Sequence, residues 1–216
     1  MYQTILFDLD GTLTDPGLGI TNSVAYTLEH YGIHVSERSE LFKFIGPPLQ
    51  YSFETFYHFS KEDAKAAVER YREYYREKGI YENALYDGMD KLLQSLHDSG
   101  RKLMVATSKP EEFALQILDY FDIKKYFSFV AGAGMDGTRG SKAEVIAYAL
   151  EKGNVTDLSS AVMTGDREYD ILGAKQMGLA SIGVLFGYGT REELEAAGAD
   201  YIAPGVADIG NIVNQP

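Results

Sequence analysis

The sequence predicts an α/β fold, a doubly wound parallel sheet with helices on both faces and an all-helical domain inserted into it. From about residue 84 onward, short β-type runs alternate with stretches of helical periodicity, which is the pattern of βαβ units. Before that point, Thr4–Phe7 is the one convincing strand, and residues 16–83 are helical in pattern. The first strand therefore belongs to the later sheet. We expect one domain from residues 1–15 and 84–216, and a second, inserted domain from residues 16–83.

The composition is that of an ordinary globular protein and excludes several functions. The chain has 216 residues, of which 45% are hydrophobic and 24% charged. Its net charge of −12 argues against a nucleic-acid polymer or an anionic membrane as a partner. Because there is no cysteine, disulfides, thiolate zinc sites and cysteine nucleophiles are excluded. No signal region and no apolar run of membrane-spanning length is found, so we expect a cytoplasmic protein.

The inserted segment contains helices separated by a stiff turn. Asp15-Pro16 reads as a cap and first-turn proline for a helix that ends at Gly32. The proline pair in Phe44–Leu49 cannot lie inside a helix. Ser60–Asp63 resembles a capping box that opens a helix ending at Gly79. The predicted apolar face of this last helix is Ala64, Ala67, Val68, Tyr71 and Tyr75.

The remaining elements alternate between helix and strand up to the C-terminus. We expect strands at Lys102–Ala106, Phe127–Ala131, Ala161–Thr164, Ser181–Leu185 and Tyr201–Ala203. We expect helices at Met89–Leu96, Phe113–Tyr120, Lys142–Glu151 and Ile171–Met177, with a short one opened by the Thr190–Glu193 capping box.

Polar residues gather where these strands end. Asp8 and Asp10 follow the first strand, Thr107-Ser108-Lys109 the second, and Gly165–Asp170 a later one, while Lys142 begins a helix. In a doubly wound sheet these ends meet at one edge, where ligands bind. Two carboxylates so close together repel unless a cation compensates them, and a hard divalent cation is the simplest one. Carboxylates, a hydroxyl and a lysine around such a cation suit phosphoryl transfer.

These residues also resemble a known family. Asp8-Leu9-Asp10-Gly11-Thr12, then Thr107 or Ser108, Lys142, and Gly165-Asp166 with Asp170 are similar to the four motifs of the haloacid dehalogenase superfamily. The resemblance covers nearly the whole chain and implies a Rossmann-like core with an inserted helical cap of the C1 type. Ile45–Leu49 and the overall layout resemble the phosphoglycolate phosphatase-like branch, which includes 5′-nucleotidases.

The resemblance implies a role for each residue. Asp8 would be the nucleophile that forms an aspartyl-phosphate, and Asp10 would be the general acid and then the general base. Mg²⁺ would be held by the Asp8 carboxylate, the Asp10 backbone carbonyl and Asp166, with Asp170 ordering its shell through water. Phosphate would be bound by Thr107 and Lys142 with backbone N–H groups of Leu9 to Gly11 and of Ser108.

The predicted function is that of a Mg²⁺-dependent phosphomonoesterase acting on a small phosphorylated metabolite, similar to phosphoglycolate phosphatase. A 5′-nucleotidase is the first alternative. Sugar-phosphate mutases resembling β-phosphoglucomutase typically have a histidine where Ile20-Thr21 stand and lack an acid at Asp170, so hydrolysis is favoured over isomerisation. A non-catalytic binding protein on the same scaffold is a further alternative. Lys43, Gly46 and Gln50 are candidates for substrate specificity, and the oligomeric state is not predicted.

Simpler structural interpretations exist for several of these residues. Asp8 and Asp10 could form a solvated turn, and Thr107 could cap the next helix. Lys142 could be a solvated helix lysine, and Asp170 a first-turn acid favoured by the helix dipole. The convergence of roles makes these interpretations less favourable than a catalytic site.

Two other patterns invite a different function. Gly132–Gly137 matches the spacing of a dinucleotide-binding fingerprint, but Thr138-Arg139-Gly140 continues the turn before any helix begins, and Asp157 precedes a strand. The tyrosines could be a stacking surface for a base, although the interior of the inserted domain is the favoured interpretation. They are Tyr71, Tyr74, Tyr75, Tyr81 and Tyr86.

Overall fold

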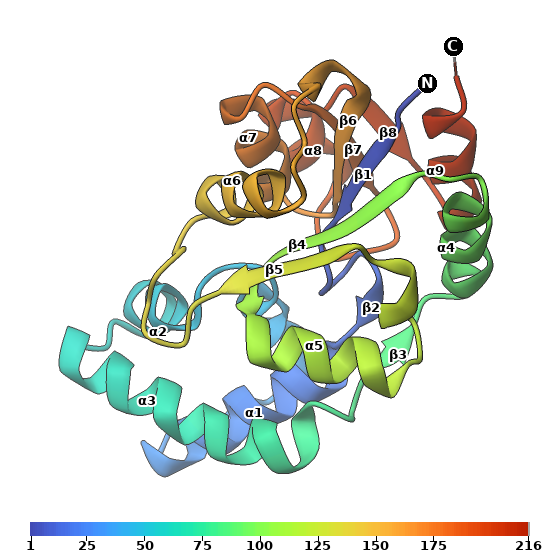
Figure 1. Ribbon diagram of the computed structural model, residues 1–216. Helices are drawn as coiled ribbons and strands as arrows, with labels where there is room; N and C mark the ends of the chain where they lie inside the picture. The colour runs from blue at the N-terminus through green and yellow to red at the C-terminus, as the bar shows by residue number, and fades with distance from the viewer. Residues whose placement is uncertain (216) are drawn as a thin grey trace. The chain divides into compact units, whose positions relative to one another are not determined.

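The computed structural model describes residues 1–215, and the chain divides into two compact units (Figure 1). Met1–Thr14 and Leu85–Pro216 form the first unit, and Asp15–Ala84 forms the second. The chain passes between them at β2 (Thr14–Asp15) and β3 (Ala84–Leu85), which pair in a two-stranded sheet. The function of the second unit as a cap stays a prediction.

The first unit is built on a six-stranded sheet in which every pairing is parallel. Its strand order is β5-β4-β1-β6-β7-β8. The strands are β1 (Thr4–Phe7), β4 (Lys102–Pro110), β5 (Phe129–Ala133), β6 (Ala161–Gly165), β7 (Ala180–Val184) and β8 (Tyr201–Ala203). The central strand β1 is buried throughout, as expected of a parallel strand covered on both faces. The predicted α/β fold is confirmed.

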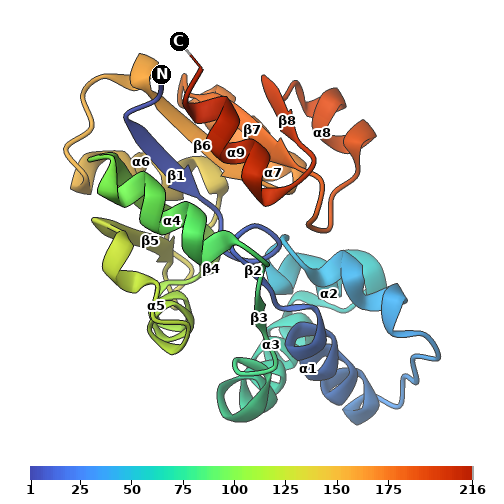
Figure 2. The ribbon, with the colours of Figure 1, turned by 90° about the vertical axis from the view of Figure 1, so that its right-hand side faces the viewer.

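Helices cover both faces of this sheet. The α-helices of the unit are α4 (Met89–Asp98), α5 (Glu111–Tyr120), α6 (Lys142–Lys152), α7 (Glu168–Gln176), α8 (Arg191–Ala197) and α9 (Val206–Val213). Two short 3₁₀ turns, Lys124–Tyr126 and Leu158–Ser160, precede β5 and β6. Figures 1 and 2 show α4 and α9 on one face and α6 and α7 on the other. Within residues 1–215, no helix combines the length and apolar character needed to cross a membrane.

One core cluster lies between the sheet and the face that carries α6. Alternate residues of the central strands point into it, including Leu6, Met104 and Met163, and they meet Val145 and Ile146 of α6. All five side chains are fully buried. Because strand side chains alternate between faces, this packing fixes the register of β1, β4 and β6. It therefore fixes where each strand ends, and so where the residues after it lie.

The second unit is helical between β2 and β3. Its elements are α1 (Gly17–His30), a 3₁₀ segment (Arg38–Phe44), α2 (Leu49–Tyr57), α3 (Lys61–Tyr74) and a π-helical turn (Tyr75–Gly79). The predicted cap of α3 is present, because the Asp63 N–H donates to Ser60 Oγ at 3.1 Å. The stacked rings of Tyr71 and Tyr75 are buried in this unit, as predicted. For Tyr81 and Tyr86 the prediction is wrong, because Tyr81 is 52% exposed and Tyr86 belongs to the first unit.

The bounds of several observed elements differ from the predicted ones. β4 continues to Pro110 instead of ending at Ala106, and β5 begins two residues later than predicted, at Phe129. The helix α1 begins at Gly17, with Pro16 as its cap rather than its first residue. The helices α2 and α9 were not predicted.

The strand order reverses between β1 and β6, which lie side by side. From β1 the chain runs outward through β4 to β5, and from β6 it runs the other way through β7 to β8. Phe7 pairs with Thr164, so the residues that follow β1 and β6 leave the sheet together. Such a reversal leaves a crevice at the carboxyl ends of the two strands, where ligands bind in this class of fold.

Candidate active site

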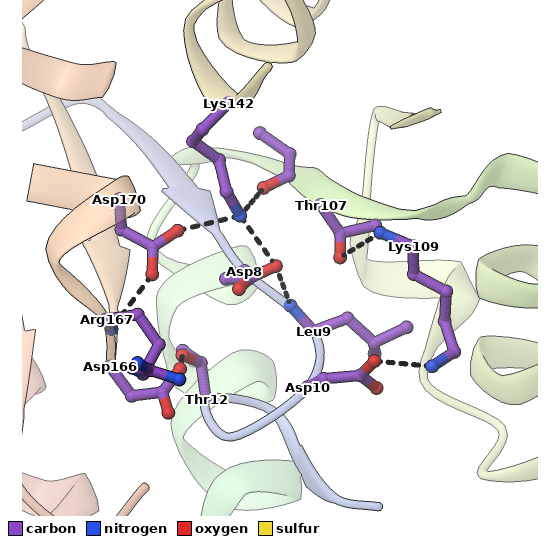
Figure 3. A network of polar contacts seen from close by, with 11 residues as sticks. Asp8, Leu9, Asp10, Thr12, Thr107, Lys109, Lys142, Asp166, Arg167 and Asp170 are labelled. Carbon is purple, nitrogen blue, oxygen red and sulfur yellow. Dashed lines mark hydrogen bonds and ion pairs between the residues drawn. The ribbon is translucent and has the colours of Figure 1, made fainter. Parts of the chain in front are cut away.

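Three buried aspartates meet at this strand reversal (Figure 3). Asp8 follows β1, Asp166 follows β6, and Asp170 lies in the first turn of α7. They are 5%, 0% and 0% exposed. One carboxylate oxygen from each lies within 4.8 Å of the others. Segments more than 150 residues apart in the chain thus supply one cluster of oxygen ligands.

One lysine neutralises part of this charge. Lys142 Nζ lies 2.9 Å from Asp8 Oδ1 and 2.7 Å from Asp170 Oδ1, and it donates to the Ala106 carbonyl at 3.2 Å. Burial alone would lower the pKa of Lys142, but the charges of Asp170 and Asp8 outweigh it and raise the pKa. Asp8 Oδ1 also accepts from the Leu9 N–H at 2.8 Å. Both contacts of Asp8 fall on Oδ1, so neither of them occupies Oδ2.

Asp166 is held by groups that approach it very closely. The Tyr188 N–H donates to its Oδ2 at 2.8 Å, and Thr12 Oγ1 donates to its Oδ1 at 3.3 Å. A Cβ at Gly11 would lie 2.2 Å from Asp166 Oδ2, and one at Gly187 would lie 2.4 Å from Asp166 Cβ. Only glycine can therefore occupy these two positions beside an undisturbed Asp166.

The charge balance of the cluster fits a divalent cation. Burial raises the pKa of Asp166 well above its usual range, and the charges of Asp170 and Asp8 add to that rise. Burial also raises the pKa of Asp170, to about 6, although Lys142 opposes it. Three acids against one lysine leave an uncompensated negative charge. A set of carboxylate oxygens is the ligand chemistry that Mg²⁺ prefers, so the residues present fit that ion.

Asp10 lies outside this cluster and has its own lysine. Its side chain is 12% exposed, and its Oδ2 pairs with Nζ of Lys109, whose side chain is 6% exposed. Burial raises the pKa of Asp10, and the charge and hydrogen bond of Lys109 oppose that rise. Asp10 Oδ1 is buried and has no hydrogen-bond partner among the described residues.

Apart from Lys142, the predicted phosphate-binding groups lie on β4 and in the turn after β1. Thr107 is buried and accepts the Lys109 N–H on Oγ1 at 3.2 Å, whereas the cap of α5 is Pro110, so Thr107 does not cap that helix. Ser108 is half-buried. The Gly11 N–H donates to the Thr14 carbonyl at 2.8 Å. The roles of these groups toward phosphate stay predictions.

The simpler interpretations of Lys142 and Asp170 do not describe the structure fully. Lys142 is 6% exposed and is therefore not a solvated helix lysine. Asp170 does cap α7, since its Oδ2 accepts the Arg167 N–H at 3.1 Å, but its Oδ1 faces Lys142. One carboxylate thus serves both the helix and the cluster.

The predicted specificity residues belong to the unit Asp15–Ala84. The Lys43 ammonium lies 5.0 Å from the ring centre of Phe56, and Gln50 Nε2 donates to Glu54 Oε1 at 2.8 Å. Gly46 has a φ of 107°, a conformation that favours glycine. These contacts are local and assign no ligand, so the three roles stay predictions.

Sequence reasoning missed several residues that shape the site. The sequence pattern assigns Lys109 no role, although its position directly after Thr107-Ser108 signals proximity to the site. Thr12, Gly187 and Tyr188 hold Asp166. The Gly187-Tyr188-Gly189 pattern after β7 was a usable signal of close backbone approach.

The Gly132–Gly137 segment does not open a helix. The next helix, α6, begins at Lys142, where Ser141 caps it in a capping box with Glu144. Asp157 caps the short 3₁₀ turn before β6 by accepting the Ser159 N–H at 3.1 Å. A dinucleotide site is thus ruled out at this loop, because the fingerprint requires a glycine turn that leads directly into a helix.

Comparison with known proteins assigns the family. Residues 5–184 match the family model described as haloacid dehalogenase-like hydrolase, and the chain belongs to this family. It is 45% identical over 195 residues to a protein of Pseudomonas aeruginosa named 5′-nucleotidase, covering 90% of this chain and 88% of the relative. A solved structure from Clostridium acetobutylicum, titled a predicted phosphatase, has 47% identity and a TM-score of 0.95, covering 99% of this chain and 98% of the other.

More distant relatives have other names. A phosphoglycolate phosphatase of Vibrio parahaemolyticus is 29% identical, with 98% of this chain and 96% of the relative covered. A protein of Mycobacterium tuberculosis named tyrosine-protein kinase PtkA is 39% identical, but the match covers 89% of this chain and only 65% of the relative. These findings confirm the predicted superfamily and the prediction of a hydrolase with phosphatase relatives.

Proposed function

We propose that this protein is a Mg²⁺-dependent phosphomonoesterase that works through an aspartyl-phosphate on Asp8. The observation that supports this most directly is the meeting of Asp8, Asp166 and Asp170 with Lys142 at the strand reversal. A buried cluster of this kind costs stability unless a ligand repays it. A bound cation offsets the negative charge of the three carboxylates, and a bound phosphoryl group offsets the positive charge of Lys142.

In the first step, a carboxylate oxygen of Asp8 attacks the phosphorus atom. The bond from phosphorus to the ester oxygen breaks as the bond to Asp8 forms, and Asp10 gives its carboxyl proton to the leaving oxygen. Lys142 and the hydroxyl of Thr107 donate to the phosphoryl oxygens, on which negative charge is spread in the transition state. The products of this step are an alcohol and the phosphorylated Asp8.

In the second step, water replaces the carboxylate on phosphorus. Asp10, now ionised, accepts a proton from the water molecule, whose oxygen attacks the phosphorus. The bond between phosphorus and Asp8 breaks, so inorganic phosphate leaves and both aspartates return to their initial states. One residue thus serves as acid and then as base.

Mg²⁺ would be held by the carboxylates of Asp8 and Asp166 and the backbone carbonyl of Asp10, with Asp170 beside them. When bound, it supplies positive charge that screens the attacking carboxylate from the anionic substrate and stabilises the transferred phosphoryl group. Thr12 and the Tyr188 N–H keep Asp166 oriented for this purpose.

The substrate class that the relatives support first is a 5′-nucleotide. The relative named 5′-nucleotidase is 45% identical, against 29% for the phosphoglycolate phosphatase. This ordering favours the 5′-nucleotidase alternative over the phosphoglycolate phosphatase that the sequence motifs suggested first. We assign substrate selection to the cap, residues 16–83, with Lys43, Gly46 and Gln50 as the candidate residues.

A phosphate-release screen tests the proposal. The panel contains nucleoside 5′-monophosphates, 2-phosphoglycolate, β-glucose 1-phosphate and phosphotyrosine, each assayed with Mg²⁺ and with EDTA. We expect phosphate release that requires Mg²⁺, is lost in Asp8→Asn and has the highest kcat/KM for a nucleotide. Glucose 6-phosphate formed without net phosphate release would establish a mutase instead. No turnover of any substrate would favour a binding protein.

A further inference from the structure

A second lysine, Lys109, holds Asp10 in an ion pair that the two steps above do not use. The pair joins Lys109 Nζ to Asp10 Oδ2, and both side chains are largely buried. Lys102 lies on the same strand and differs from it, because its ammonium donates to the Gly153 carbonyl at 2.6 Å, away from the cluster of acids. A buried lysine is costly unless a specific partner repays it.

The backbone of β4 is irregular at the point that carries Lys109. Thr107 pairs with Gly132 of β5, but the next pair joins Pro110 to Ala133, so Ser108 and Lys109 are extra residues in β4. A bulge of this kind bends a strand and re-aims its side chains. Gly132 makes room for it, because a Cβ there would lie 2.8 Å from the Lys109 carbonyl oxygen and 2.5 Å from Glu111 Cα.

The pair gives the two oxygens of Asp10 different roles. An ammonium group donates hydrogen bonds and cannot accept one. A protonated carboxyl group accepts best through its carbonyl oxygen, so the contact with Lys109 favours Oδ2 as that oxygen and places the carboxyl proton on Oδ1. Oδ1 is the buried oxygen without a hydrogen-bond partner among the described residues.

The two lysines of the site contact different acids. Lys142 contacts Asp8 and Asp170, whereas Lys109 contacts Asp10 (Figure 3). The carboxylate of Asp10 is correspondingly not part of the cluster of Asp8, Asp166 and Asp170. An acid that donates a proton has to stay off the metal, and the ion pair with Lys109 keeps it off.

We propose that Lys109 is the positioning residue for proton transfer: it fixes Oδ2 of Asp10 and so directs the carboxyl proton, on Oδ1, to the leaving oxygen. This inference rests on the proposed function. Lys109 then acts through Asp10 and does not bind phosphate. Its loss should slow the cleavage of esters whose leaving group needs a proton and spare those whose leaving group does not.

Two aryl-bearing substrates of similar size separate these cases. The alkoxide of 4-nitrobenzyl phosphate needs a proton to leave, whereas the phenolate of 2,4-dinitrophenyl phosphate leaves without one. Release of each alcohol is followed in a single turnover with enzyme in excess, which isolates the first step. We expect Lys109→Met to slow the benzyl ester about 100-fold, the lower range for loss of a general acid, and the dinitrophenyl ester less than about threefold.

Three further variants make the test specific. Arginine, like lysine, donates hydrogen bonds and accepts none. Lys109→Arg should therefore cleave the benzyl ester faster than Lys109→Met does. In an Asp10→Asn background, Lys109→Met should cause no further loss, because its partner is already disabled. Lys102→Met removes a lysine from the same strand away from the acids and should leave both rates unchanged.

The ratio of the two rates is measured on one preparation, so a partly unfolded variant does not distort it. An equal loss on both esters, no loss on either, or a further loss in the Asp10→Asn background would each overturn the role of Lys109. A wild-type enzyme that releases no phosphate from these two esters or from any ester of the screen above would overturn the proposed function first, and this inference with it.

Discussion

A β carbon at Gly11 would lie 2.2 Å from Oδ2 of Asp166, so the first strand-end turn can approach this acid only as glycine. Gly11 also has a φ of 81°, in the left-handed region. The turn after β1 and the acid after β6 are thereby fitted to each other, although 154 residues separate Thr12 of that turn from Asp166. The motif around Asp8 therefore requires a glycine at position 11 for steric reasons, in addition to its two carboxylates.

Gly11→Ala tests this requirement. We expect Mg²⁺-dependent activity to fall at least about 100-fold, because Asp166 must move or the turn must open, and a small misplacement at an active site costs about that much. The matched control is Gly178→Ala, which has a φ of 73° and no atom within 4 Å of its added Cβ. Both variants should lose about 1–2 kcal/mol of unfolding free energy from backbone strain. Activity in Gly11→Ala equal to that of the control would contradict the close fit.

Removal of Lys142 should cost both stability and activity. Lys142→Met leaves Asp8 and Asp170 buried without their cation, at a cost of about 3–5 kcal/mol in unfolding free energy. Urea unfolding measures this loss. The double variant Lys142→Met with Asp170→Asn removes one of the two unpaired buried charges. It should recover part of the unfolding free energy that Lys142→Met loses. A double variant no more stable than the single one would show that the charge imbalance is not the cause.

The stability gained from Mg²⁺ should depend on pH. Burial raises the pKa of Asp166 well above its usual range and that of Asp170 to about 6. The metal-free folded protein therefore holds protons that the unfolded chain has lost, and its stability falls as pH rises from about 4 through about 6. Mg²⁺ requires ionised carboxylates, so its stabilising effect grows over the same range.

Thermal unfolding with and without Mg²⁺ measures this dependence. At about pH 7.5, Mg²⁺ at roughly 100 times its Kd should add about 2.7 kcal/mol, which is roughly 5–10 °C in Tm for a chain of this size. At about pH 5 the shift should be much smaller. Asp166→Asn is the control and should show little shift at either pH. A shift independent of pH would argue against the buried acids as the metal ligands.

The cap of α6 should matter for activity as well as stability. Ser141 Oγ accepts the Glu144 N–H at 3.3 Å and begins the helix whose first residue is Lys142. Ser141→Ala should lose about 1 kcal/mol, as should Ser60→Ala, which removes the corresponding cap of α3. Only Ser141→Ala should lower kcat, by a few-fold, since it loosens the turn that carries Lys142. Equal kcat values in the two variants would show that the cap does not position the lysine.

The sequence predicted the parallel sheet and most of its elements because their signals are local. Tyr201–Ala203 was predicted with its observed bounds, since it is a short β-type run between two turns. The helix α2 was missed although Leu49, Phe53, Phe56 and Tyr57 recur at helical spacing, because it is only nine residues long and directly follows the Pro47-Pro48 turn. The extension of β4 to Pro110 depends on the bulge opposite Gly132, and a pairing partner cannot be read from one strand alone.

The acids of the site could be predicted because each ends a strand, but their partners could not. Which lysine meets which aspartate depends on the bulge in β4 and on the start of α6, and both are tertiary features. The approach of Gly187 and Tyr188 to Asp166 likewise joins the ends of β6 and β7. These contacts follow from sheet order, which sequence periodicity does not specify.

Trapping the covalent intermediate tests the central claim most directly. Asp10→Asn slows the second step, whereas the first step with 2,4-dinitrophenyl phosphate needs no proton from Asp10. The variant is therefore mixed with this ester and Mg²⁺, reduced with borohydride and digested. Reduction converts an aspartyl-phosphate to homoserine, which mass spectrometry locates in the chain. We predict homoserine at position 8 and unchanged aspartate at positions 166 and 170. Homoserine at another of these positions, or none while wild-type enzyme turns over the same substrate, would contradict Asp8 as the nucleophile.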